Sequence, residues 1–324
     1  MSLPATQSSR VAEEPVFRTV GIVGLGLIGG SIALAVRGVW PAVRIVAVDT
    51  PAVLAAARRA GAIDAGSEDL DVVAEADVVF LAAARSAGAI DAGSEDLGVV
   101  ADADVVVLAA PVRQNIEVLR RLAGRVKPLA IITDVGSTKR DIVGAAAALP
   151  AGATFVAGHP VAGAALGGFE NARADLFRNR PWLFTPVSST PATAVERLEA
   201  FASALGAMAG VMTLDEHDRV FAFVSHMPQL AVSALMAVAG NAVGAEGLAL
   251  SGRGLLDTTR LASSPSGIWQ DVAAVNADHI ASALDALIAA LQSLRADLSS
   301  GERLAEVFAD AARWREELVS RSTL

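Results

Sequence analysis

Short apolar runs alternate with amphipathic segments along the first two thirds of the chain. From Phe17 to about Thr213, runs rich in Val, Ile and Ala are separated by segments whose apolar positions have helical spacing. This alternation is typical of a parallel β-sheet whose strands are joined by helical crossovers. The expected strands are Thr19–Val23, Arg44–Val48 and residues 104–109, 130–134, 154–157, 182–185 and 207–212.

The pattern changes near Thr213. Beyond it the strand-like runs end, and Ala- and Leu-rich helical patterns continue to the C-terminus with breaks near residues 252–254 and 263–267. The sequence therefore predicts three parts. They are a loose leader over residues 1–14, an α/β domain over residues 15–213 and an all-α domain over residues 214–324.

A tandem duplication lies inside the α/β domain. Residues 57–83 and 84–110 match at 23 of 27 positions. Two copies are too few for a solenoid, so we interpret them as an insertion. We expect the second copy to form the strand beside Thr19–Val23, because it leads directly into Ala110 and Pro111. The first copy is then expected to be displaced toward the outer edge of the sheet, as an added strand and helix or a loop.

Composition excludes several classes of function. The chain has no cysteine, which removes disulfides, thiolate nucleophiles and Cys-based metal sites, and it has four histidines. Its net charge of -9 without a long basic run argues against nucleic-acid binding. The most apolar stretch, residues 230–243, is too short for a membrane span and contains Asn241. With no secretory signal at the N-terminus, we expect a cytoplasmic protein.

A glycine-rich turn follows the first expected strand. Glycines in this pattern permit a tight turn, a close approach of backbone N–H groups to a pyrophosphate, and packing of the next helix on the strand. Asp49 ends the second strand, where a carboxylate would bind the ribose hydroxyls and repel a 2′-phosphate, so NAD is favoured over NADP. Asp49 is also open to interpretation as a helix N-cap. The expected cofactor-binding residues are Gly24, Gly26, Leu27, Ile28, Gly29, Asp49, Ala110, Pro111 and Ser137.

Two further polar residues follow later strands. Ser137 lies between an expected strand and a helix, and His159 lies between Gly158 and Pro160 at the end of the next strand. Both therefore belong at the carboxyl edge of the sheet, where open α/β folds bind ligands. The structural alternatives are an N-cap serine and a loop histidine without catalytic function.

These residues occur within motifs that extend along most of the chain. The chain resembles the prephenate/arogenate dehydrogenase family over residues 17–298. The matching motifs are Val23–Ser31, Ala110-Pro111-Val112, Asp134–Lys139, Gly158–Gly163 with Gly168, Leu176-Phe177, Leu183–Pro186, Glu216-His217-Asp218, Ser225–Pro228, Asp257–Ala262 and Ile268-Trp269. The resemblance implies a Rossmann-type doubly wound sheet followed by an all-α domain for dimerisation and substrate binding.

The resemblance also implies roles for particular residues. His159 would hydrogen-bond the ring hydroxyl of prephenate, Ser137 would support it beside the nicotinamide, and Arg260 would bind a substrate carboxylate. A neutral imidazole suits proton removal from that hydroxyl at neutral pH, and the chemistry requires no metal. Arg260 has a structural alternative, an ion pair with Asp257 three residues earlier on a helix.

The substrate side chain is expected to meet His226 and Gln229. His226 lies in an apolar helix and is alternatively a core histidine, while many relatives carry a second histidine where this chain has Gln229. That departure leaves prephenate and arogenate both open as substrates. His217 is expected to make local hydrogen bonds and His279 to be solvated, and Trp269 is expected to pack in the interior.

Two other functions remain alternatives. One is a different two-domain reductase, such as a 3-hydroxyacid dehydrogenase or an imine reductase, but those place a catalytic lysine in the helical half and residues 214–324 contain none. The other is a regulatory or structural protein that binds the cofactor without activity. In each case the apolar helices at residues 230–243 and 284–294 indicate a homodimer formed through the helical domain.

Overall fold

The computed structural model describes residues 14–67, 78–82, 105–109, 112–113, 115–116, 119, 131–149, 154–163 and 166–322. Its strands form a single sheet in the order β3-β2-β1-β4-β5-β6-β7-β8-β9. All neighbours are parallel except β7 and β8, which are antiparallel. The strands are β1 Thr19–Val23, β2 Arg44–Val48, β3 Ala65–Ser67, β4 Val78–Ala82, β5 Val105–Ala109, β6 Ile131–Asp134, β7 Thr154–Pro160, β8 Pro181–Thr185 and β9 Met208–Val211.

The doubly wound α/β fold expected from the sequence is confirmed, and the seven expected strands are present. β3 and β4 were not among these seven strands, and both lie in the first copy of the duplication, for which an added strand or a loop was expected. The helices of this domain are α1 Leu27–Val39, α2 Pro51–Arg59, α4 Arg140–Ala146 and α5 Ala192–Ala204. A helix over residues 114–125, which the sequence also predicts, lies largely outside the described residues.

The main strand of the first copy, β4, does not lie at the edge of the sheet, so that expectation was wrong. Only the short strand β3 of this copy lies at the edge, beside β2. Its strand β4 pairs with β1, with Ile22 opposite Phe80, and β5 of the second copy pairs with β4 on the other side, with Phe80 opposite Val107. Both copies carry nearly the same run of Val, Leu and Ala, so both suit a central parallel strand. A central position also pairs the backbone groups of each strand on two sides, which an edge position does not.

An aromatic cluster holds α1 and α5 against one face of the sheet. Phe201 of α5 lies with its ring centroid 5.4 Å from Phe17, 6.3 Å from Trp40 and 6.4 Å from Trp182 of β8. All four side chains are buried, and burial of such large apolar surfaces is the main stabilising contribution in a core. The cluster fixes β8 and the end of α1 in one rigid unit.

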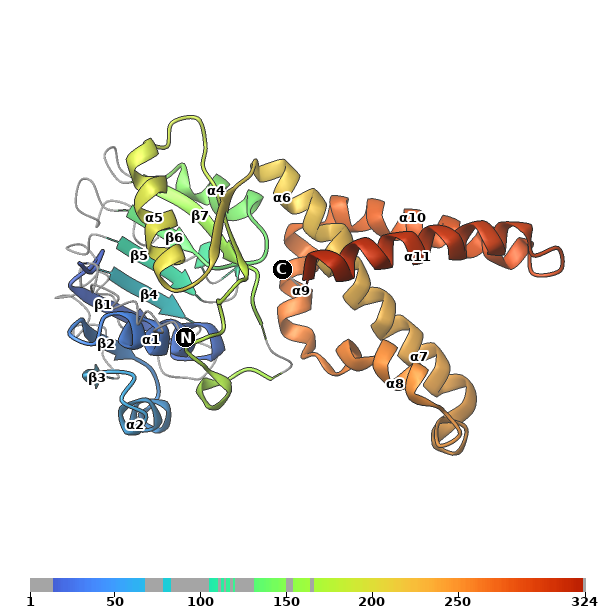
Figure 1. Cartoon of the computed structure of the whole chain (residues 1–324), viewed down its shortest axis with the longest axis horizontal. Coiled ribbons are helices and arrows are strands. Elements are labelled where there is room, and N and C mark those ends of the chain that lie inside the picture. The colour runs from blue at the N-terminus through green and yellow to red at the C-terminus, as the bar shows by residue number, and fades with distance from the viewer. Residues whose placement is uncertain are drawn as a thin grey trace, which may run out of the picture.

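The helical domain lies beside one end of the sheet and divides into two arms (Figure 1). One arm contains α7 and α8, and the other contains α10 and α11. Its helices are α6 Leu214–Phe221, α7 Met227–Leu248, α8 Arg253–Thr258, α9 Ser266–Val275, α10 Ala277–Ala296 and α11 Glu302–Ser322, with a π-helical turn Ala222–His226 between α6 and α7.

Thr213 lies at the start of the helical part. Its hydroxyl accepts a hydrogen bond from the N–H of Glu216 and caps α6, two residues after β9 ends.

The continuous helical segment Leu214–Leu248 has the length and apolar composition of a membrane-spanning helix, although it contains the charged residues at the start of α6. Only 22% of its most apolar window is buried within the chain.

Deleting either copy of the duplication should leave a folded protein. The remaining strand can pair with both β1 and β6, because residues 57–83 and 84–110 differ at four positions only. We expect the variants lacking residues 57–83 and residues 84–110 to show the same helix content and a single cooperative unfolding transition by circular dichroism. Aggregation of both variants would show that the sheet requires two copies.

Candidate active site

The glycine-rich turn connects β1 to α1 in the geometry that an anion requires. Gly24 has φ +85°, which favours glycine, and a Cβ on Gly29 would lie 2.1 Å from the carbonyl oxygen of Gly24. The first turn of α1 contains no acidic residue, and its N-cap, Gly26, has no side chain to occupy the free N–H groups. The positive end of α1 is therefore available to a phosphate group.

Asp49 braces this turn from the end of β2. Its carboxylate accepts hydrogen bonds from the N–H groups of Leu25 and Thr50, both at 2.6 Å. The N-cap of α2 is Thr50, so Asp49 is not the N-cap of that helix. A carboxylate has about four acceptor positions, and acceptor capacity therefore remains for ribose hydroxyls.

A buried ion pair joins the ends of β6 and β7. The Nζ atom of Lys139 lies 2.6 Å from Oδ2 of Asp134 and donates a second hydrogen bond of 2.6 Å to the carbonyl oxygen of Gly158. Burial is the largest influence on both groups. It raises the pKa of Asp134 and lowers the pKa of Lys139, while their mutual attraction opposes both shifts. The pair fixes the backbone beside His159.

Ser137 lies between β6 and α4 and is half-buried. It is not the N-cap of α4, since that helix begins at Arg140 after Lys139. The N-terminus of α4 is instead capped by Asp218 of α6, whose carboxylate accepts hydrogen bonds from the N–H groups of Lys139 (2.8 Å) and Arg140 (2.9 Å). A carboxylate suits this position because the helix dipole is positive there.

The same carboxylate begins a chain of hydrogen bonds that ends at His159. Asp218 Oδ1 lies 2.9 Å from Nδ1 of His217, and Nε2 of His217 lies 2.9 Å from Nδ1 of His159. All three side chains are buried, and the ring of Phe221 packs against both imidazoles. We call this series the Asp218–His217–His159 relay. Of these three residues, the sequence analysis predicted only His159 as a site residue and expected local hydrogen bonds for His217.

The electrostatics of the relay favour neutral imidazoles beside a charged carboxylate. Burial lowers the pKa of His159 well below its usual range, and the nearby His217 and Lys139 add to the effect. Burial also lowers the pKa of His217, partly opposed by its hydrogen bond to Asp218. Burial alone would raise the pKa of Asp218, but hydrogen bonds from His217, Arg140 and Lys139 outweigh it and leave that pKa lowered.

His226 lies on the π-helical turn, a feature that often marks functional sites. Its Nδ1 atom lies 3.3 Å from Nδ2 of Asn276, and its Nε2 atom is buried without a hydrogen-bond partner among the described residues. Burial lowers the pKa of His226 to about 4. Asn276 also donates to the carbonyl oxygen of Asp218 at 2.9 Å, which connects His226 to the start of the relay.

Gln229 and Arg260 lie close together in the helical domain. Gln229 is buried on α7 and donates a hydrogen bond of 2.8 Å to the carbonyl oxygen of Leu261. Arg260 begins the 3₁₀ turn Arg260–Ser263 and is exposed. Among the ion pairs of the described residues, none joins Arg260 to Asp257.

The other residues considered from the sequence lie apart from the relay. Trp269 packs against the apolar cluster around Val272 and lies 6.3 Å from the His226 ring. His279 is half-buried, with its Nε2 atom 3.3 Å from Asp215. Ala110 and Pro111 lie outside the described residues.

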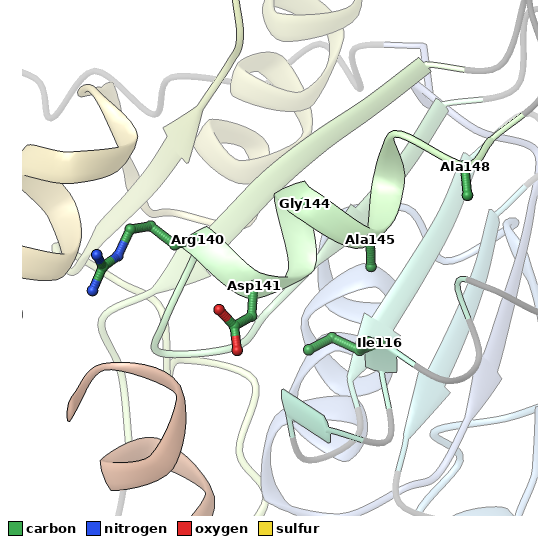
Figure 2. A pocket seen from close by; sticks show the side chains of 6 residues that line it. All are labelled: Ile116, Arg140, Asp141, Gly144, Ala145 and Ala148. Carbon is green, nitrogen blue, oxygen red and sulfur yellow. The ribbon is translucent and has the colours of Figure 1, made fainter. Parts of the chain in front are cut away.

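A separate shallow pocket borders α4 (Figure 2). It is lined by Ile116, Arg140, Asp141, Gly144, Ala145 and Ala148. The Arg140 side chain extends away from Ile116, and it pairs with Asp278 of α10 and Asn276. The pocket contains none of the histidines, and we do not regard it as the active site.

A glycine-rich turn that suits a phosphate and a buried histidine relay, at the carboxyl edge of the parallel strands β1 to β7, are the arrangement of a dinucleotide-dependent oxidoreductase. The family model "Prephenate dehydrogenase, nucleotide-binding domain" matches residues 82–211, and "Prephenate dehydrogenase, dimerization domain" matches residues 213–310. The chain belongs to the prephenate dehydrogenase family.

Individual relatives agree with this assignment. Prephenate dehydrogenase of Bacillus subtilis is 32% identical over 94% of this chain and 76% of its own length. Cyclohexadienyl dehydrogenase of Zymomonas mobilis is 29% identical over 93% of this chain and 96% of its own length. The structure of Aquifex aeolicus prephenate dehydrogenase with hydroxyphenyl propionate and NAD+ superposes with a TM-score of 0.77, at 26% identity over 93% of this chain and 98% of that one.

Replacing Asp218 with Asn should destabilise the protein. A single amide oxygen cannot accept hydrogen bonds from both sides of the carboxylate, so one of the three donors is left facing an NH2 group. We expect the free energy of unfolding, measured by urea denaturation, to fall by about 1–3 kcal/mol.

The matched control is Asp215→Asn, an exposed carboxylate one turn earlier on α6. We expect that control to change the free energy of unfolding by less than about 0.5 kcal/mol. Equal effects of the two substitutions would contradict the capping role of Asp218.

Proposed function

We propose that the protein catalyses the NAD-dependent oxidative decarboxylation of prephenate to 4-hydroxyphenylpyruvate. The observation that carries this proposal is the Asp218–His217–His159 relay, which gives His159 the protonation state of a general base. Family membership supports the substrate class. Arogenate, which would give tyrosine, is the alternative substrate that the sequence leaves open.

The turn between β1 and α1 fits NAD. Gly24, Gly26 and Gly29 leave the N-terminus of α1 open for the pyrophosphate, and Asp49 retains acceptor capacity for the ribose hydroxyls. Leu27 and Ile28 form the first turn of α1, beside that position. Ala110, Pro111 and Ser137 complete the proposed cofactor-binding set.

The relay determines which nitrogen of His159 is basic. Ionised Asp218 can only accept, so Nδ1 of His217 carries a proton and Nε2 of neutral His217 is an acceptor. His159 must then donate from Nδ1, which leaves the lone pair of the neutral ring on Nε2. His217 and Asp218 are positioning residues, and His159 is the proposed catalytic base.

His159 removes the proton of the substrate ring hydroxyl through Nε2, with Ser137 supporting that hydroxyl. NAD+ held by the glycine-rich turn, Asp49 and Ser137 would supply the hydride acceptor for the ring carbon that bears the hydroxyl. The ring carboxylate leaves as CO2, and its bonding electrons restore an aromatic ring that carries a phenolate oxygen. This oxygen takes back the proton from His159, so that the product is the phenol. Because aromatisation drives the reaction forward, the protein mainly orients the substrate and holds the proton acceptor.

Arg260 and His226 are the proposed ligands of the substrate's other oxygen atoms. A guanidinium binds a carboxylate with two parallel hydrogen bonds and stays charged at every relevant pH. The Oδ1 atom of Asn276 accepts from Arg140, so its Nδ2 faces Nδ1 of His226. Neutral His226 therefore carries its proton on Nε2, which is a buried donor suited to a substrate oxygen.

The helical domain is the proposed homodimer interface. The matched dimerization-domain model covers α6 to α10, and this region exposes large apolar side chains, including Leu235, Val238 and Leu291. Exposed apolar faces of this kind are typical of subunit contacts. A second copy of the chain would cover the apolar segment of α7, and the enzyme would work as a soluble cytoplasmic dimer.

His159→Asn should abolish most turnover while leaving the fold and NAD binding intact. Loss of a positioned general base costs roughly 10²- to 10⁴-fold in kcat. The assay follows NADH formation with prephenate and with arogenate in turn, and His279→Asn serves as the control histidine. Near-normal turnover of His159→Asn would remove that residue from the mechanism, and no NADH formation by the wild-type protein with either substrate would refute the proposed function.

The pH dependence should show a low acid limit. The active form is neutral His159, and burial holds its pKa below the usual value of 6.5. We therefore expect kcat/KM to stay constant as the pH falls to about 6.5 and to decline only below it. A decline centred above that pH would contradict the neutral relay, provided that circular dichroism shows the protein folded throughout.

A further inference from the structure

We propose that Gln229 is a positioning residue that holds the 3₁₀ turn carrying Arg260, and that it does not contact the substrate side chain. This inference rests on the proposed function, in which Arg260 binds a substrate carboxylate. Its basis is the way the Gln229 amide is used in the structure.

Both ends of the Gln229 amide are bound to groups of the protein. Nε2 donates to the carbonyl oxygen of Leu261 at 2.8 Å and to the hydroxyl of Ser233 at 3.3 Å, while Oε1 accepts from the hydroxyl of Ser264 at 3.3 Å. The carbonyl of Leu261 can only accept, so the orientation of the amide is fixed. Two of the three bonds therefore join Gln229 to Leu261 and Ser264, which follow Arg260 by one and four positions.

The turn itself has little else to hold it. No residue of the 3₁₀ turn Arg260–Ser263 is buried, and its own backbone bonds are those of one short turn, such as Ala262 N–H to the Thr259 carbonyl at 2.9 Å. Short 3₁₀ turns have poor hydrogen-bond geometry and depend on their surroundings. Gln229 is 4% exposed on α7, so it supplies a rigid and desolvated anchor.

Because both N–H groups of the Gln229 amide are already hydrogen-bonded, the amide has few hydrogen bonds left to make with a ligand. Both N–H bonds of the amide are used, and only a lone pair of Oε1 is left. The keto and carboxylate oxygens of a pyruvyl group are acceptors, which this lone pair cannot bind. Gln229 as oriented thus does not bind the pyruvyl group of prephenate. The remaining lone pair could accept only from a donor such as the ammonium group of arogenate, and a changed ratio of KM for the two substrates would reveal that contact.

The test compares KM for the substrate across four variants. Gln229→Leu keeps the volume and removes the amide, Ser264→Ala removes the bond to Oε1 alone, Arg260→Gln removes the carboxylate ligand, and a double variant combines Gln229→Leu with Arg260→Gln. Gln270→Leu, at an exposed glutamine on α9, is the matched control. We expect Gln229→Leu to raise KM about 5- to 30-fold, the worth of one to two hydrogen bonds, and Ser264→Ala to raise it less.

Three results would support positioning. KM for prephenate and arogenate rises by the same factor in Gln229→Leu, kcat and the KM for NAD+ change less than about twofold, and the double variant has the same KM as Arg260→Gln alone. A changed ratio of the two substrates, or a double variant in which the single effects multiply, would overturn the proposal and make Gln229 a direct ligand.

A binding measurement separates this proposal from the proposed function. Calorimetric titration with hydroxyphenyl propionate, a carboxylate ligand, requires no turnover. If the wild-type protein reduces NAD+ with neither substrate, the proposed function fails. The positioning role of Gln229 is still tested by comparing the affinity for this ligand among Gln229→Leu, Arg260→Gln and the double variant. If the affinity is unchanged in Gln229→Leu but weakened in Arg260→Gln, the positioning role of Gln229 is overturned while the proposed function stands.

Discussion

The carboxylate of Asp218 is the interaction on which the candidate site depends. It lies in the helical domain, yet it closes the N-terminus of α4 in the sheet domain and fixes the proton of His217. Moving the two domains apart would therefore uncap a helix and release the relay in one step. A buried charge of this kind is tolerated only where donors satisfy it on all sides, and here the helix dipole and three N–H groups do so. The Asp218 carboxylate thus both joins the two domains and fixes which nitrogen of His159 is basic.

Several other polar groups near the relay are also hydrogen-bonded to groups of the protein. Lys139 donates hydrogen bonds to Asp134 and to the carbonyl oxygen of Gly158. The amide of Asn276 is hydrogen-bonded to Asp218, His226 and Arg140. The amide of Gln229 is hydrogen-bonded to the turn that follows Arg260. In a low-dielectric interior such networks are rigid because each unmade bond is costly. Among the described residues, Nε2 of His226 is buried without a hydrogen-bond partner, and so are the hydroxyls of Thr133 and Thr138. The relay leaves a lone pair on Nε2 of His159.

Local patterns in the sequence were sufficient for the fold and for part of the site. Alternating apolar runs located the seven strands, and the glycines after β1 located the phosphate-binding turn, because both signals are encoded within a few residues. Asp218 was missed as a cap and relay member because its partners Lys139 and Arg140 lie 79 and 78 positions away. The placement of the first copy was wrong for a different reason: two nearly identical strands carry the same periodicity, and only pairing within the whole sheet decides where each lies.

The duplicated strand changes the width of the edge on which a cofactor would lie. Between β1, which leads to the glycine turn, and β6, which leads to Ser137, the sheet contains both β4 and β5. Three strand spacings of about 4.8 Å separate β1 from β6, roughly 14 Å, where a single copy would give about 10 Å. A dinucleotide has a fixed covalent length, so one that contacts both the glycine turn and Ser137 must cross this added width. The twist of the sheet, about 20–25° between neighbouring strands, turns the carboxyl ends of β1 and β6 away from each other and adds to this distance.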